Sequence, residues 1–133
     1  MRTRLRIARP VTDIERSTDM YCRGLGLRVL GRFEDHEGFD GVMLGTPGAD
    51  YQFELTHHRA RPVRPSPTVE DLAVFYVPGE RDWIAACARM LAAGFKEVAP
   101  FNPYWAVRGR TYEDADGYRV VVERSAWVED FAE

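Results

Sequence analysis

Residues 10–30 read PVTDIERSTDMYCRGLGLRVL, and this stretch decides the fold. It predicts the end of a strand, a capped amphipathic helix, a glycine stop and the start of a second strand. Thr12 and Glu15 have the capping-box spacing, in which each side chain satisfies a backbone N–H that the first helical turn leaves unpaired. Gly26 can take the positive φ that ends a helix. One face of the helix carries the less polar side chains, which are Ile14, Thr18, Tyr21, Cys22 and Leu25.

The same order of elements returns in the second half of the chain. The first half predicts strands at 4–7, 27–33, 41–44 and 51–57 around this helix. The second half predicts a strand at 72–77, a helix at 81–93 with Trp83, Ile84, Cys87 and Leu91 on one face, and strands at 95–98, 106–112 and 118–124. Gly26 and Gly94 lie 68 positions apart, and a shift of 67 carries Glu54 onto Val121. Each half is therefore predicted to be a βαβββ module, and the fold class to be α+β.

The 133 residues predict one domain with two parts. The first module is expected over residues 1–58 and the second over residues 69–127. Residues 59–68 are rich in Pro and Arg and have no apolar period. Prolines cannot join a strand ladder, so this segment is expected to be an extended linker.

Composition narrows the class of protein. Hydrophobic residues at 45% and charged residues at 29% are typical of soluble globular proteins. The net charge of −3 argues against nucleic acid as a partner, and the clustered arginines have no aromatic platform beside them. No apolar run is long enough to span a bilayer, and the N-terminus lacks the apolar core of a signal peptide. We therefore expect no membrane partner and a cytoplasmic location. Cys22 and Cys87 are interpreted as buried thiols, with a disulfide or a nucleophile as the alternatives.

Three sequence segments of this duplicated chain resemble segments of a known superfamily. They are DIERSTDMYCRGLGLRVL at 13–30, FELTH at 53–57 and YEDADGYRVVVER at 112–124. In this order they resemble the first helix, the fourth strand and the last hairpin of the vicinal oxygen chelate superfamily, which includes glyoxalase I, extradiol dioxygenases, and fosfomycin and bleomycin resistance proteins. Asn102–Trp105 is similar to one subgroup of uncharacterised glyoxalase-like proteins. The resemblance implies that two curved mixed sheets enclose a cavity, completed within the chain or across a homodimer.

The resemblance also implies where a metal would be held. In metal-dependent members the ligands come from the first and last strands of both modules, at positions that correspond to Arg6, Glu54, Leu72 and Val121. Only Glu54 can ligate a metal, and Arg6 places a positive charge where the cation would be. We therefore expect no metal and no other cofactor. A divalent metal held by Glu54 with His58, or with a carboxylate displaced to Glu123, is the alternative; Glu123 itself is interpreted as an exposed residue at a strand end.

Six residues are candidates for ligand binding: Arg6, Glu54, Tyr76, Tyr104, Trp105 and Arg119. By strand alternation, the side chains of Arg6 and Glu54 are expected to face the cavity. They are predicted to form a bidentate ion pair across the former metal site, unless both simply reach solvent. Tyr76, Tyr104 and Trp105 offer flat apolar contact area, although Trp105 is equally suited to a dimer contact or the core. Arg119 favours an anionic or polar aromatic ligand.

Two classes of function follow from the residues and the resemblance. The first is a metal-independent protein that binds a small polar or aromatic molecule in its cavity as a homodimer, as drug-sequestering relatives do. The second is a lyase, isomerase or dioxygenase-type enzyme that uses a metal, or Glu54 as a general base. The sequence does not identify the ligand, and it leaves open whether the modules pair within one chain or are exchanged between two.

Overall fold

The computed structural model describes residues 1–127, which form two modules with the same order of elements. The first contains β1 (Leu5–Pro10), α1 (Ile14–Leu25), β2 (Arg28–His36), β3 (Phe39–Gly45) and β4 (Tyr51–His58). The second contains β5 (Leu72–Tyr76), α2 (Glu80–Ala92), β6 (Lys96–Val98), the short α3 (Tyr104–Val107), β7 (Gly109–Glu113) and β8 (Arg119–Glu123). The predicted α+β fold with two βαβββ modules is confirmed.

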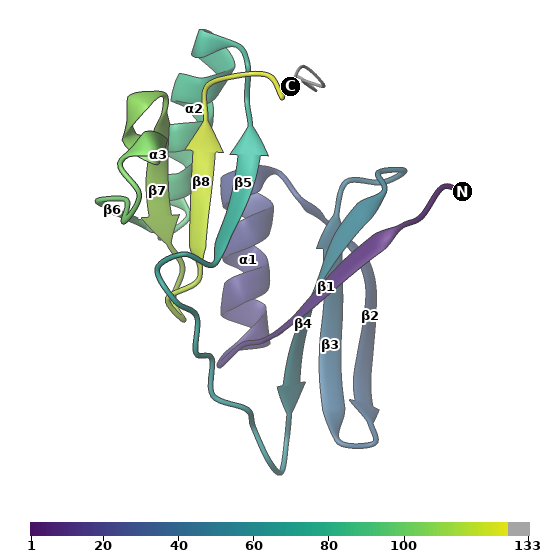
Figure 1. Ribbon diagram of the computed structural model, residues 1–133. Helices are drawn as coiled ribbons and strands as arrows, with labels where there is room; N and C mark the ends of the chain where they lie inside the picture. Colours follow the sequence, from purple (N-terminus) through teal and green to yellow (C-terminus); the bar gives the residue numbers. More distant parts are fainter. Residues whose placement is uncertain (128–133) are drawn as a thin grey trace.

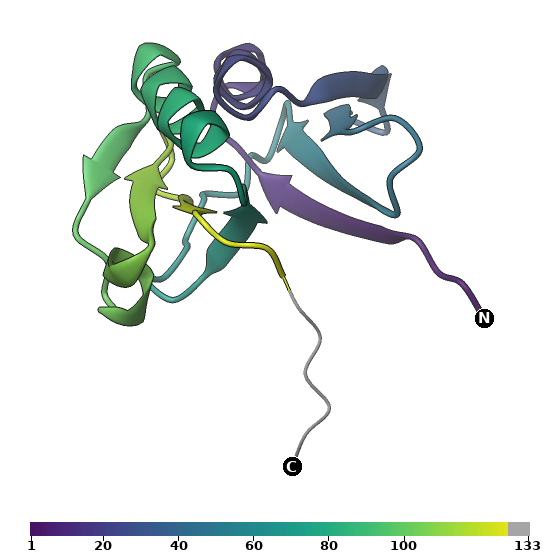
Figure 2. The same ribbon diagram turned by 90° about the horizontal axis from the view of Figure 1, so that it is seen from above.

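Both modules build the same four-stranded mixed sheet. The strand orders are β1-β4-β3-β2 and β5-β8-β7-β6, and in each sheet the first strand pairs in parallel with the last while the other pairs are antiparallel. Figure 1 shows β8 between β5 and β7 in the second sheet, and β4 has the corresponding position between β1 and β3 in the first. In Figure 2, α1 and α2 lie next to each other on the same side of the two sheets, and they are in contact. The two sheets do not close around a common barrel.

Strand alternation separates a core face from a second face. Val42, Leu44, Phe53 and Leu55 of the first sheet and Val120 and Val122 of the second belong to one buried cluster with α1 and α2. Their neighbours along the strands point the other way. We call this second side the far face; it contains Arg6, Gln52 and Glu54 in the first sheet and Leu72, Val121 and Glu123 in the second.

Two local predictions about the helices are wrong. The cap of α1 is Asp13, whose carboxylate accepts from the N–H of Arg16 at 3.1 Å, and no capping box forms between Thr12 and Glu15. In α2, Ala86, Cys87 and Met90 are buried, whereas Ile84 and Leu91 are exposed. The helical period thus correctly predicted a helix here, but it did not identify which side chains of α2 are buried. Gly26 does end α1, with a φ of 70°.

The segment after β6 also differs from its prediction. Residues 106–107, expected in a strand, belong to α3, and β7 starts only at Gly109. Asn102 starts the turn, because its side-chain oxygen accepts from the N–H of Tyr104 at 3.0 Å. Cys87 is buried, Cys22 is half-buried, and both are free thiols. No helix within residues 1–127 is long and apolar enough to cross a membrane.

The two modules are joined by a buried hydrogen bond. The hydroxyl of Tyr21 on α1 donates to Oδ2 of Asp114, which follows β7, at 2.7 Å. Burial, and then the neighbouring Asp114 carboxylate, raise the pKa of Tyr21 well above its usual value of 10.0. Nearby, the hydroxyl of Tyr118 donates to the carbonyl of Pro10 at 2.8 Å, and the guanidinium of Arg9 lies over the rings of Phe53 and Tyr118. The modules therefore share one core.

This hydrogen bond predicts a loss of stability in alkali. A tyrosine whose folded pKa is raised stabilises the fold fully below the unfolded pKa of about 10, and that contribution is lost as the pH rises through the folded pKa. We expect the free energy of unfolding to fall above pH 10, by up to about 1.4 kcal/mol per pH unit for each such tyrosine. Tyr21→Phe should make the fall shallower in urea titrations between pH 8 and 11. An unchanged slope would show that Tyr21 ionises normally in the folded protein.

Candidate functional site

The far face of the first sheet carries a small polar cluster. Arg6 on β1 donates from Nε to the side-chain oxygen of Gln52 on β4 at 2.8 Å. Its Nη1 lies 4.0 Å from a carboxylate oxygen of Glu54, which is the outer limit of an ion pair. The predicted bidentate bond between Arg6 and Glu54 is therefore absent, because Gln52, the register partner of Arg6, takes the guanidinium instead.

This cluster does not fit a superfamily-type metal. Arg6 provides a permanent cation, and Leu72 and Val121 have no donor atom, so Glu54 is the one ligand among the four corresponding positions. Val121 is also fully buried. Within residues 1–127 no group of three or more His, Cys, Asp or Glu side chains is placed to hold a metal ion.

The long Arg6–Glu54 distance predicts a weak coupling between the two charges. The Arg6 side chain is 53% exposed, and that of Glu54 is 16% exposed. Water therefore screens the pair, and a double-mutant cycle with Arg6→Ala and Glu54→Ala should give a coupling of about 0.5 kcal/mol or less. A bidentate buried pair would give a coupling of several kcal/mol, and chemical denaturation of the four proteins separates the two cases. The pair Arg23–Asp19 on α1, at 3.3 Å, is a matched surface control.

The far face of the second sheet contains a pocket of about 180 Å³. Trp105 of α3 lies beside it, together with Leu72 of β5, Thr111 of β7 and Arg119 of β8. The Arg119 side chain is only 12% exposed and donates from Nε to Glu113 at 3.1 Å. The hydroxyl of Thr111 is buried and has no hydrogen-bond partner within residues 1–127. The pocket thus combines an aromatic wall, a cation and an unused hydroxyl, which is the donor set for a polar or anionic aromatic molecule.

The six predicted ligand-binding residues are not brought together in one chain. Trp105 and Arg119 line the same pocket, which contains neither Arg6 nor Glu54. Tyr104 packs edge-on against Trp105, with ring centroids 4.9 Å apart, and its own exposed side borders a different pocket. Tyr76 lies on the far face of β5, exposed, with its ring 6.0 Å from that of Trp127. The residues therefore occupy two separate far faces.

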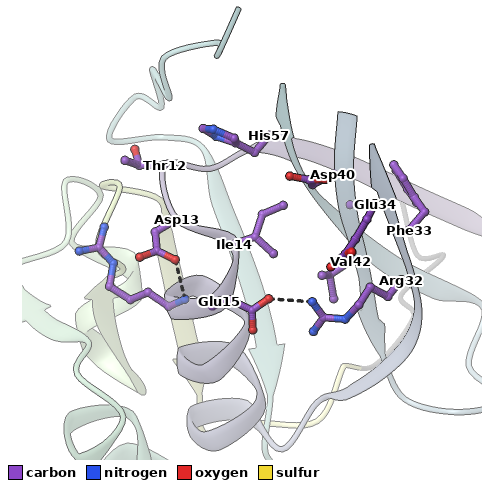
Figure 3. Close-up of a pocket in the computed structure, with 12 residues that line it drawn as sticks. Thr12, Asp13, Ile14, Glu15, Arg32, Phe33, Glu34, Asp40, Val42 and His57 are labelled. Carbon is purple, nitrogen blue, oxygen red and sulfur yellow. Dashed lines mark hydrogen bonds and ion pairs between the residues drawn. The ribbon is translucent and has the colours of Figure 1, made fainter. Parts of the chain in front are cut away.

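A larger pocket lies elsewhere, on the core side of the first sheet. It has a volume of about 510 Å³ and lies between the start of α1 and the strands β2, β3 and β4 (Figure 3). Two of its carboxylates have partners already: Glu15 pairs with Arg32 at 2.7 Å, and Asp40 pairs with Arg59 at 2.9 Å. The hydrogen bond from Arg59 lowers the pKa of the Asp40 carboxyl. His57, as Figure 3 shows, lies at its rim, with Nδ1 3.1 Å from the carbonyl of Val11.

Sequence reasoning missed two groups that border the pocket of Arg119, and it misjudged the burial of a third group, Glu123. Thr111 and Asn102 line the pocket of Arg119, and Glu123 is not an exposed strand-end residue but only 4% exposed. Strand alternation placed the Glu123 side chain on the same face as that of Val121, and this was the one indication in the sequence that Glu123 could border a pocket. What the sequence could not show is that α3 folds over this face and covers it.

Comparisons with known proteins agree with this architecture. Residues 5–56 match the family described as the YycE-like N-terminal domain, and residues 70–124 match the YycE-like C-terminal domain. The chain is 40% identical over 121 residues to the uncharacterized protein YycE of Bacillus subtilis strain 168, covering 91% of this chain and 87% of that protein. The crystal structure of the B. subtilis YycE protein has a TM-score of 0.88 at 38% identity, covering 96% of this chain and 93% of that one.

More distant structures share the fold alone. Glyoxalase I of Leishmania major, described as trypanothione-dependent, has a TM-score of 0.72 at 20% identity, covering 94% of this chain and 88% of that one. TnmS3, an antibiotic binding protein from Streptomyces sp. CB03234, has a TM-score of 0.61 at 21% identity, covering 92% and 94%. The predicted resemblance to the vicinal oxygen chelate superfamily is confirmed at the level of fold.

Proposed function

The chain belongs to the YycE-like family, and on that premise we propose that it is a metal-independent, cytoplasmic binding protein for a small polar or aromatic molecule. The observation that carries this proposal is the position of Arg6. Its guanidinium, anchored on Gln52, lies beside the one carboxylate at the corresponding metal positions. Because Arg6 holds one of the four corresponding ligand positions and cannot coordinate a metal, Glu54 has too few partners there to bind a divalent ion tightly.

The chemistry of the ligand is inferred from the second far face. Arg119 is a cation held in a fixed orientation by Glu113, and its planar guanidinium suits a carboxylate or another planar anion. Trp105 supplies a flat apolar wall, and Thr111 supplies a hydroxyl without a partner in the described residues. A small aromatic acid satisfies all three groups.

We propose that a second copy of the chain completes the cavity. The pocket of about 180 Å³ is smaller than the roughly 300–1,000 Å³ of typical ligand sites. Large apolar side chains around the two far faces and α3 are exposed in the single chain; they are Phe39, Tyr76, Phe101, Tyr104 and Val107. An exposed set of this kind marks an interaction surface. In a homodimer, the far face of one chain's first sheet would cover that of the partner's second sheet, bringing Arg6 and Glu54 to the ligand.

A catalytic function is the second candidate, and Glu54 is the observation that favours it. Its side chain is largely buried, and no hydrogen bond to it is found in the described residues beyond the loose contact with Arg6. A carboxylate with a free oxygen can act as a general base in a lyase or isomerase reaction, and the Leishmania structure with the same fold is a glyoxalase. Glu54→Gln separates the functions: it should abolish turnover but leave ligand binding through Arg119 nearly unchanged.

The proposal is tested by a binding screen. Purified protein is titrated with benzoate, salicylate and indole-3-acetate by calorimetry, with and without EDTA. We expect binding of at least one aromatic acid, unaffected by the chelator, at one ligand per chain. Light scattering on the same samples should give the mass of a dimer. Failure of all aromatic acids to bind, or binding that EDTA abolishes, would contradict the proposal.

A further inference from the structure

The carboxylate of Glu123 is buried and is incompletely paired within residues 1–127. It lies at the end of β8 with only 4% of its surface exposed, and its Oε1 has no hydrogen-bond partner within residues 1–127. A buried, ionised and unpaired carboxylate is costly, so native proteins normally supply such a group with a donor. The partner of Glu123 is therefore expected to come from outside the described part of the chain.

The backbone is shaped around this side chain. Gly109 is the register partner of Glu123 on β7. A Cβ atom at position 109 would lie 2.7 Å from Oε1 of Glu123 and 2.8 Å from the carbonyl oxygen of Trp105, so only glycine leaves room for both oxygens. Two acceptors are thus packed close to one point. The missing side chain at position 109 thus leaves the Glu123 carboxylate room to take a donor.

A separate small pocket opens at this carboxylate. It has a volume of about 200 Å³, and Tyr104, Val107, Arg108 and Ser125 line it together with Glu123. It shares no lining residue with the pocket of Arg119. Of the two nearby arginines, Arg124 pairs with Glu80 at 3.4 Å, and Arg108 is exposed and forms no ion pair with Glu123. The buried charged group of this pocket is therefore Glu123.

We propose that this pocket is a binding subsite for the ammonium group of a small amine, with Glu123 as its anchor. An ammonium offers three donors and a positive charge, so it can satisfy the buried Glu123 carboxylate in both charge and hydrogen bonding. A short alkyl chain would then lie against Val107 and the ring of Tyr104. This subsite does not depend on the proposed binding of aromatic acids, because its lining residues are different.

The test uses three probes of equal length: propylamine, propanol and propionate. Binding to the isotope-labelled full chain is followed at pH 7 by the NMR amide shifts of Gly109 and Ser125. We expect propylammonium to shift both resonances in a saturable way, and Glu123→Gln, which keeps the shape but removes the charge, to weaken binding at least tenfold. Gly109→Ala should weaken it as well, because the added methyl group displaces the carboxylate. Glu97→Gln, a change of the same kind on β6, should have no effect.

Several outcomes would overturn the subsite. Propionate binding in preference to propylammonium would show that Arg108, and not Glu123, governs the pocket. Equal binding of propylammonium by the wild type and Glu123→Gln would show that the charge of the carboxylate is not involved. Loss of the dimer in Glu123→Gln, measured by light scattering, would show that its partner is a side chain of a second copy. Aromatic-acid binding by the Glu123→Gln protein separates a failure of this subsite from a failure of the proposed function.

Discussion

Asp114→Ala should lower the free energy of unfolding by about 3–5 kcal/mol, because hydrogen bonds to a buried carboxylate contribute about 1.5–3 kcal/mol each. Asp114 is buried and accepts three of them: from the hydroxyl of Tyr21 at 2.7 Å and from the N–H groups of Asp116 and Tyr118 at 2.8 and 2.9 Å. The first joins the modules, and the other two shape the turn between β7 and β8. Alanine would leave all three donors without a partner. Urea denaturation at pH 7 measures the loss.

Asp114→Asn is the matched control. An amide keeps one oxygen for the two N–H donors, and its NH2 group can donate to Tyr21, so the loss should be less than half that of alanine. Asp116→Ala should cost much less, because its carboxylate accepts a hydrogen bond only from the N–H of Thr12 at 3.1 Å, on the surface. Equal losses for Asp114→Ala and Asp116→Ala would show that the buried hydrogen bond does not hold the modules together.

Arg119→Met should weaken the binding of aromatic acids about 100-fold, because a charge-assisted hydrogen bond in a buried site contributes roughly 1.5–3 kcal/mol. Methionine fills much of the same volume, so the pocket beside Trp105 keeps its shape while losing its cation. The dissociation constants of benzoate and salicylate, measured by calorimetry for both proteins, give the ratio. A neutral analogue such as benzamide should lose much less affinity.

Arg110→Met is the control for this experiment. Arg110 is on the same hairpin, but its guanidinium lies over the ring of Trp83 on the core side, 5.2 Å from the centroid. This change should leave the affinity for aromatic acids within about threefold of the wild type, since Arg110 does not line the Arg119 pocket. A similar loss in both variants would point to long-range charge and not to a contact with the ligand.

Most of the fold could be read from the sequence because its signals are local. The amphipathic period of α1, the glycine at its end and strand alternation together predicted two βαβββ modules, and the structure contains them. The errors at the start of α1 and at α3 arise because a neighbouring side chain forms a hydrogen bond that the sequence pattern did not predict. Asp13, and not Thr12, caps α1 because it directly precedes the first helical residue, Ile14, where its carboxylate accepts from the N–H of Arg16. Asn102 nucleates α3 where alternation predicted strand.

The site was less predictable, because it depends on contacts across strands. Strand alternation placed the side chains of Arg6 and Glu54 on one face. Only the parallel register of β1 and β4 shows that the Arg6 guanidinium donates to Gln52 instead. Likewise, the burial of Glu123 depends on its packing beside α3 and Gly109, which strand alternation cannot predict. Alternation gives the direction of a side chain; tertiary packing decides its partner.

Metal content measured alongside ligand binding tests the central claim most directly. Protein purified without chelators is analysed by plasma mass spectrometry, as the wild type and as Glu54→Ala, after incubation with Zn²⁺, Ni²⁺ and Fe²⁺ and extensive dialysis. With the Arg6 guanidinium beside Glu54, the wild type should retain far less than one ion per chain and bind an aromatic acid equally well in each sample. One tightly held ion per chain in the wild type, lost in Glu54→Ala together with ligand binding, would contradict the account.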